Sequence, residues 1–364
     1  MAVKVIRQMK KIALVGSASS AASIRAGTER APAALRAAGM AQRFQAAGFE
    51  VTDQGDTATR MYLPDDEHPR AKNVSAILQN LNDLRPRVEV AVKSGALPLI
   101  LAGDGISLLA VVAGVRRYYR SVRLLSADRD AGLNVPATTS SGCIDTMVIS
   151  HVVGRGAPEL IRFWGEPPLV REPDVILFGV DRLDPPEQQF LAGSSLRRDD
   201  AAGILKMGAA EAARRIVERF AGSQFVLHFD LDVISGGDFA ATNLPATGGL
   251  SWSAVREALQ VFVSQPTLAA IHLTGYNPDL DADGEAARRV VELMVELLSP
   301  RLTMEMEIPA PAEAAGTSVQ PPEQVSAGTV AETAAPTAEP APAPAPMPAP
   351  GPEGEAGDPS EPAG

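Results

Sequence analysis

The sequence contains a single cysteine, Cys143, among 364 residues. One thiol excludes an intramolecular disulfide and fits a reducing compartment, so we expect a cytoplasmic protein. No apolar run approaches the roughly 20 residues of a membrane span, and we expect no membrane association. Aromatic residues make up only 4% of the chain, and no basic stripe is interleaved with them. The sequence therefore gives little support to nucleic-acid binding.

The C-terminal segment, residues 309–364, contains no lysine or arginine. Its eight acidic residues account for most of the net charge of −11, and about −3 remains without them. The segment is rich in proline and alanine, which favours an extended, solvated chain over a packed core. We therefore predict a folded domain over residues 1–308 and a disordered tail over residues 309–364. The tail would serve as a solubilising spacer or as a docking segment for a partner.

Short apolar runs alternate with longer amphipathic segments before this tail. The apolar runs, which are typical of strands buried on both faces, cover residues 11–15, 97–102, 122–127, 174–180, 225–229 and 268–273. Helical patterns lie between them, at residues 32–47, 71–94, 107–115, 207–220, 251–264 and 284–298. This alternation predicts a three-layer α/β/α sandwich with a mainly parallel central sheet. Polar clusters follow several strands, at the edge where open α/β sheets bind ligands.

The loop from Asp128 to Asp145 carries the most informative motif. It reads DRDAGLNVPATTSSGCID and resembles the Asp-x-His-x-Asp-x-Asn to Ser-Gly-Asn-x-His loop of the arginase/agmatinase/formiminoglutamase (ureohydrolase) superfamily. Further landmarks follow in the order of that superfamily: the segment from Arg25 to Arg36, Gly103-Asp104-Gly105-Ile106-Ser107, Phe229-Asp230-Leu231-Asp232, Gly248-Gly249-Leu250-Ser251 and Tyr276-Asn277-Pro278. Their order and spacing make the resemblance specific, and it implies an arginase/deacetylase-like fold.

The resemblance also implies a set of metal-ligand positions, which in the superfamily hold two manganese ions. Positions 105 and 132 are glycines here, and since glycine has no side chain to donate, one ion site is expected to be lost. The second site keeps only carboxylates, namely Asp128, Asp130, Asp230 and Asp232. Oxygen ligands of this kind suit Mn²⁺, Mg²⁺ or Ca²⁺. Three states stay open: one divalent ion, a metal-free cluster neutralised by Arg129 and Arg182, or a solvated acidic rim.

The substrate side of the resemblance is better preserved. Asn134, Thr139 and Ser141 match positions that hold an α-carboxylate in arginases, and Asp184 matches an α-amino contact. The resemblance thus implies a small guanidino or amino-acid-like ligand. The hydroxyl cluster around Thr139 is, however, equally typical of a helix N-cap and turn.

Two positions on the catalytic side differ from the superfamily. Asp145 stands where a proton-shuttling histidine is expected, and Gly275 stands where a glutamate grips the guanidinium. A carboxylate can accept a proton, but it is a poor acid at neutral pH unless its pKa is raised. Asp145 is therefore the candidate catalytic base of a chain that lacks its guanidinium anchor.

Four histidines and the cysteine complete the set of reactive side chains. His228 and His272 lie inside apolar strand runs, which predicts hydrogen bonding in the core or, alternatively, metal ligation. His68 and His151 have no partner at ligand spacing, and we expect them at the surface or in loops. No histidine is close to Cys143 in sequence, which favours a small buried thiol over a nucleophile.

Three functional interpretations follow. The first is a non-catalytic ligand-binding, regulatory or partner subunit with the ureohydrolase fold. The second is a diverged metal-dependent hydrolase that acts on linear amidines through a single ion, with Asp145 as base. The third is a structural or assembly protein whose tail is the active part. Because members of this superfamily commonly form trimers or hexamers, we expect a homo-oligomer or a hetero-oligomer with an intact ureohydrolase.

Overall fold

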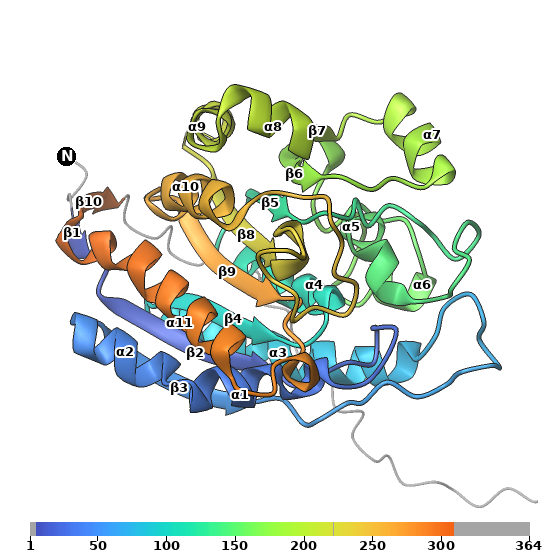
Figure 1. Ribbon diagram of the computed structural model, residues 1–364, viewed down its shortest axis with the longest axis horizontal. Helices are drawn as coiled ribbons and strands as arrows, with labels where there is room; N and C mark the ends of the chain where they lie inside the picture. Colours follow the sequence, from blue (N-terminus) through green and yellow to red (C-terminus); the bar gives the residue numbers. More distant parts are fainter. Residues whose placement is uncertain (1–4, 221, 309–364) are drawn as a thin grey trace, which may run out of the picture. The chain divides into compact units, whose positions relative to one another are not determined.

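A computed structural model describes residues 5–220 and 222–308. Its main sheet contains eight strands: β2 (Lys11–Ser17), β3 (Glu50–Asp56), β4 (Leu97–Ala102), β5 (Val122–Ala127), β6 (Val175–Val180), β7 (Arg197–Asp200), β8 (Gln224–Asp230) and β9 (Leu268–Thr274). They are ordered β3-β2-β4-β9-β8-β5-β6-β7, and every neighbouring pair is parallel (Figure 1). The predicted mainly parallel sheet is confirmed.

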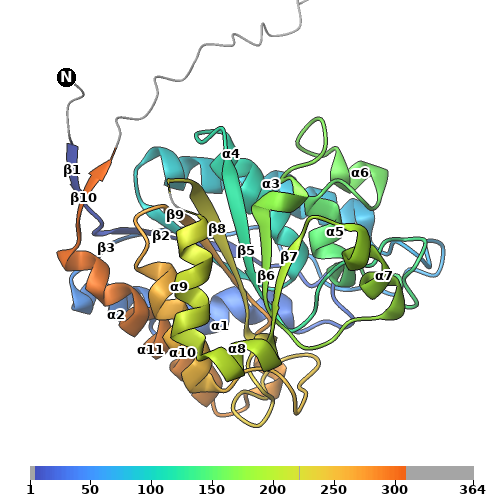
Figure 2. The same cartoon turned by 90° about the horizontal axis from the view of Figure 1, so that it is seen from above.

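Helices cover both faces of this sheet (Figure 2). One face packs against α1 (Ala31–Ala37), α2 (Met40–Ala47), α8 (Ala201–Met207), α9 (Ala209–Arg219), α10 (Trp252–Val263) and α11 (Glu285–Leu298). The opposite face packs against α3 (Val74–Lys93), α4 (Leu108–Arg116), α5 (Val148–Val152), α6 (Pro158–Ile161) and, through a few partly buried side chains, α7 (Pro185–Gly193). Two hydrophobic cores separated by the sheet make the predicted three-layer sandwich.

The central strands form where the sequence has unbroken apolar runs. All residues of β4, β6 and β9 are buried, because helices cover both of their faces. Phe178 of β6 meets Phe262 of α10 edge to face, with ring centroids 5.3 Å apart. Aromatic contacts of this geometry add about 0.5–1.5 kcal/mol beyond the burial of their area. The interior that carries the site is therefore well packed.

The predictions from sequence do not include several elements of the structure. The edge strands β3 and β7 have largely polar sequences, EVTDQGD and RRDD, since strands at the sheet edge keep exposed positions. The predicted helix over residues 32–47 is interrupted at Gly39, whose φ of 90° breaks the helical path. A separate antiparallel pair joins β1 (Val5–Gln8) to β10 (Glu305–Ile308). The tail predicted over residues 309–364 lies outside the described residues.

Among the described residues, no helix is both long enough and apolar enough to span a bilayer.

Candidate functional site

A small cavity of about 90 Å³ lies at the carboxyl ends of the central strands. Its lining includes the four predicted metal ligands Asp128, Asp130, Asp230 and Asp232, together with Asp145 and His228. Asp128 and Asp130 follow β5, whereas Asp230 ends β8 and Asp232 follows it. Because β5 and β8 are parallel neighbours, their ends bring both pairs to the same edge of the sheet. The structure therefore brings the four carboxylates together in one cavity.

Each Asp-x-Asp segment closes a local turn. Asp128 Oδ1 accepts the backbone N–H of Asp130 at 2.7 Å, and Asp230 Oδ1 accepts that of Asp232 at 2.9 Å. These bonds fix the first carboxylate of each pair at the strand end and leave its second oxygen available to the cavity. Donor atoms of Asp128, Asp230 and His228 all lie within 4.8 Å of one another.

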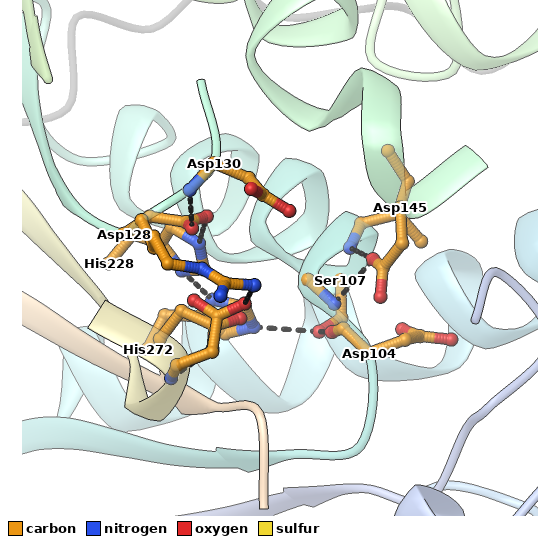
Figure 3. Close-up of polar contacts among 12 residues, drawn as sticks. Asp104, Ser107, Asp128, Asp130, Asp145, His228 and His272 are labelled. Atoms are coloured by element: carbon orange, nitrogen blue, oxygen red, sulfur yellow. Dashed lines mark hydrogen bonds and ion pairs between the residues drawn. The ribbon is translucent and has the colours of Figure 1, made fainter. Parts of the chain in front are cut away.

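His228 and His272 lie side by side, in register on β8 and β9 (Figure 3). Their Nδ1 atoms are 2.8 Å apart, and the Nε2 atom of His272 is 2.7 Å from Ser107 Oγ. On the cavity side, His228 Nε2 is 3.6 Å from Asp128 Oδ2. Burial lowers the pKa of His228 to about 3, and burial together with the neighbouring ring lowers the pKa of His272 well below its ordinary value. Both rings are therefore neutral at physiological pH.

Two arginines partly neutralise the carboxylates. Arg182 Nη2 lies 2.6 Å from Asp130 Oδ2, and the buried Arg129 places its Nη2 3.7 Å from Asp232 Oδ2 and donates to the Leu244 carbonyl at 2.9 Å. The second oxygen of each carboxylate, Asp130 Oδ1 and Asp232 Oδ1, is buried without a hydrogen-bond partner in the described part of the chain. The arginines thus engage one side of the cluster and leave oxygen donors on the other.

Burial and mutual repulsion act on the remaining charge. Burial, followed by the charges of the neighbouring carboxylates, raises the pKa of Asp128 and of Asp230 well above its usual range. Burial also raises the pKa of Asp130 to about 6, although Arg182 and Arg129 oppose the rise. Holding all these groups ionised in a small cavity is costly. The site is consequently one that favours a cation or retained protons.

The carboxylate of Asp145 is turned toward the loop that follows β4. Asp145 Oδ1 accepts the backbone N–H of Gly105 at 2.7 Å and that of Ile106 at 3.1 Å (Figure 3). A Cβ atom built on Gly105 would lie 3.0 Å from the same oxygen. Burial and the charge of Asp104 raise the pKa of Asp145 to about 8. The Asp145 side chain thus lies against position 105, and both residues line the cavity.

Comparison with known proteins agrees with this architecture. The family model described as the arginase family matches residues 10–299. The chain belongs to the arginase family. It is 26% identical to the arginase of Bacillus caldovelox over 302 residues, which cover 81% of this chain and 100% of that one.

Solved structures of arginase-family members share the fold. The crystal structure of arginase from Bacillus cereus has a TM-score of 0.74 and 25% identity, and the match covers 79% of this chain and 98% of that one. Formimidoylglutamase from Bacillus subtilis has a TM-score of 0.63 at 17% identity, and the match covers 81% of this chain and 88% of that one. The second likeness concerns the fold alone.

Three positions of the site differ in side chain from the pattern of metal and guanidinium ligands that the resemblance implies. Gly105 and Gly132 offer no side-chain ligand, and Asp145 occupies the space beside Gly105. Gly275 has a φ of +88°, and a Cβ there would come to 2.1 Å from Asp230 Oδ1. A side chain at position 275 would therefore require the Asp230 carboxylate to move and would sit on a backbone conformation that residues with a Cβ rarely adopt.

The four predicted substrate-binding residues lie in the loop and helix that follow β5 and β6. Asn134 Nδ2 donates to Asp184 Oδ2 at 3.0 Å, so these two predicted residues meet. Asp184 also starts α7 through a capping box with Glu187. Thr139 Oγ1 accepts the backbone N–H groups of Ser141 and Gly142, which is the turn role that the sequence left open. None of these side chains lines the acidic cavity itself.

Other sequence predictions have mixed outcomes. Cys143 is buried, as expected, and burial raises the pKa of its thiol to about 12. His151, expected at the surface or in a loop, is instead 1% exposed in α5. The prediction failed because the ring satisfies both nitrogens locally: Nδ1 is 2.7 Å from the Met147 carbonyl, and Nε2 accepts the Ala157 N–H at 3.1 Å.

The predictions from sequence do not place His228 in the acidic cavity, whereas the structure does. An apolar strand run indicates burial of both faces, and it says nothing of which side chains reach the strand end. The available signal was the spacing of His228 and Asp230, because residues two apart on a strand share a face. That spacing predicts an imidazole beside the carboxylate of Asp230.

Proposed function

We propose that this arginase-family chain does not hydrolyse guanidines by a two-metal route and acts as a non-catalytic ligand-binding or regulatory subunit. The observation that carries the proposal is the contact between Asp145 and Gly105. The carboxylate accepts two backbone N–H groups at the position where the family pattern expects a metal-binding side chain. The Asp145 carboxylate lies against Gly105 and takes part of the room that a ligand side chain at position 105 would need.

The two-metal reaction needs both ions, since they bridge and acidify the attacking water. Gly105 and Gly132 remove ligands from one of them, and Gly275 removes the expected guanidinium anchor. Losing one preorganised charge-stabilising group typically costs about 10²–10³ in rate. Several such losses together support a chain without useful guanidine hydrolysis.

The ligand we propose is a small guanidino or amino-acid-like compound. Carboxylates dominate the polar lining of the cavity, and a guanidinium or ammonium group would form charge-assisted hydrogen bonds with them. The pair of Asn134 and Asp184 supplies amide and carboxylate groups of the kind that an amino acid requires.

The test is urea release by the purified full-length chain. Arginine, agmatine and guanidinobutyrate would each be assayed with Mn²⁺, with Mg²⁺ and without metal, beside an arginase with the complete ligand set. We expect no release above the blank from this chain. Manganese-dependent turnover near ordinary enzyme rates, about 10 per second, would refute the proposal.

A second candidate is a diverged hydrolase of linear amidines that uses Asp145 as its base. It is favoured by the fact that Asp145 lines the same cavity as Asp128 and His228. Screening amidine and amide compounds for ammonia release would test it. Release that is abolished by Asp145→Asn would support it, whereas release that survives the substitution would assign the activity elsewhere.

We also propose that the chain assembles with itself or with an intact ureohydrolase. The support is family membership, because a catalytically reduced subunit can persist by stabilising an active relative. Light scattering and co-purification with such a relative would test it. A monomer that recovers no relative would contradict it.

A further inference from the structure

We propose that one divalent transition-metal ion binds between His228 Nε2 and the carboxylates of Asp128 and Asp230. The imidazole of His228, on β8, would then take the place of ligands that the family pattern expects and this chain lacks. The inference goes beyond the proposed function, which concerns a small organic ligand, by placing a metal ion in the same acidic cavity. It differs from the all-oxygen site expected from the sequence, because the expected partners Asp130 and Asp232 face Arg182 and Arg129.

The protonation of His228 follows from a chain of hydrogen bonds. Ser107 Oγ lies 2.7 Å from the Asp104 carbonyl, which can only accept, so the hydroxyl donates there. The same oxygen then accepts from His272 Nε2–H at 2.7 Å. A neutral His272 has its lone pair on Nδ1 and accepts from His228 Nδ1–H at 2.8 Å. The remaining nitrogen, His228 Nε2, is therefore unprotonated.

This unprotonated nitrogen is directed at a carboxylate. His228 is 1% exposed and lines the cavity, and the hydrogen bond of its ring to His272 uses Nδ1 and leaves Nε2 on the side of Asp128. It faces Asp128 Oδ2 at 3.6 Å. Two electron-rich atoms at that separation repel unless a positive charge lies between them. The arrangement thus calls for a cation or a proton at this point.

The spacing fits a metal ion. Zinc ligands stand about 2.0–2.2 Å from the ion, so two of them on one ion are roughly 3–4 Å apart, in agreement with the separation of His228 and Asp128. Mutual distances within 4.8 Å add Asp230 as a third ligand. An imidazole ligand suits Zn²⁺ and other transition metals, whereas Mg²⁺ and Ca²⁺ prefer oxygen alone.

His272 and Ser107 act as positioning residues for this ligand. A metal-bound histidine usually donates its other N–H to a fixed partner, which sets its tautomer and orientation, and loss of such a partner costs about 10–100-fold in metal affinity. Here the partner of His228 is His272, and the partner of His272 is Ser107. Ser107 is buried and does not line the cavity, so its substitution tests the relay without removing a ligand.

The experiment uses the full-length chain after chelator treatment. Titration calorimetry with Zn²⁺ should give one site per chain that excess Mg²⁺ does not displace, and X-ray absorption of the zinc-loaded protein should show imidazole scattering. His228→Asn should weaken binding by more than the effect of Ser107→Ala, for which we expect about 10–100-fold. The matched control is His151→Asn, a buried histidine outside the cavity, which should leave zinc affinity unchanged.

Several results would overturn the inference. They are the absence of zinc binding, two sites per chain, a zinc spectrum with oxygen ligands only, and affinity that is indifferent to His228→Asn. If His228→Asn fails to fold, the spectrum of the unsubstituted protein and the effect of Ser107→Ala decide. If the protein neither binds zinc nor releases urea, only this inference is contradicted. If the protein releases urea, the proposed function is contradicted whatever the zinc result.

Discussion

The carboxylate of Asp145 and the backbone of Gly105 share one small space. Asp145 Oδ1 accepts the Gly105 N–H at 2.7 Å, and a Cβ on Gly105 would approach that oxygen to 3.0 Å and Val148 Cγ2 to 3.3 Å. The carboxylate of Asp145 thus takes part of the space that a side chain at position 105 would need.

Gly105→His should therefore destabilise the protein. The new imidazole overpacks the contact with Asp145 and Val148, and overpacking of a full interior costs about 1–3 kcal/mol. Urea denaturation followed by circular dichroism measures the loss. Gly193→His is the control, because no atom lies within 4 Å of a Cβ at this exposed position. Equal stability of the two variants would show that Asp145 moves away freely.

The two arginines at the acidic cluster should contribute unequally to stability. The Arg129 side chain is 5% exposed and that of Arg182 is 50% exposed. Removing one partner of a buried pair leaves an uncompensated charge, so we expect Arg129→Gln to cost about 3 kcal/mol. Arg182→Gln should cost less than about 1 kcal/mol, since water screens an exposed pair. Chemical denaturation measures the free energy of unfolding of both variants. A larger loss in Arg182→Gln than in Arg129→Gln would contradict the prediction.

His151 should make the folded state sensitive to acid. Burial lowers its pKa from 6.5 to about 4, so between these values the unfolded chain binds more protons than the folded chain. The free energy of unfolding should therefore fall as the pH drops through this window, by about 3 kcal/mol in total. In His151→Gln this part of the pH dependence should disappear, whereas in the exposed His68→Gln it should remain. Denaturation at pH 7 and pH 4.5 gives the difference, and identical pH profiles for His151→Gln and the unsubstituted chain would contradict it.

Removal of residues 309–364 should leave the domain stable. The last described strand, β10, ends at Ile308, and the predicted tail offers little apolar surface. We expect the truncated chain to melt within a few degrees of the full chain, since about 1 kcal/mol corresponds to about 2–4 °C at this size. Differential scanning calorimetry of both proteins tests this. A truncated chain that is insoluble or melts far lower would show that the tail supports the domain.

The sequence predicts those strands whose burial on both faces produces a run of apolar residues. The runs at residues 97–102 and 122–127 coincide with β4 and β5, because both faces of these strands are covered and most of their positions are apolar. β7 has the sequence RRDD and gives no such signal, since it forms the edge of the sheet. Its pairing with β6 depends on backbone hydrogen bonds that any sequence can make.

The features of the site can likewise be divided into those that the sequence predicts and those that it does not. The convergence of Asp128 and Asp230 followed from motif order, because both end neighbouring parallel strands. The orientation of Asp145 toward the Gly105 N–H, and the pairing of His228 with His272, depend on contacts between elements far apart in sequence. Neither composition nor spacing encodes such contacts. The oligomeric state, the cytoplasmic location and the tail boundary stay predictions.

The conformation of Gly275 constrains whether position 275 could hold the guanidinium anchor that the family pattern places there. Any side chain at that position begins with a Cβ 2.1 Å from an oxygen of Asp230 and on a backbone with φ of +88°, so a glutamate introduced there meets a collision before it can reach a guanidinium. The Asp230 carboxylate would have to move to make room for it, so a glutamate at position 275 is coupled to the position of a carboxylate of the acidic cavity.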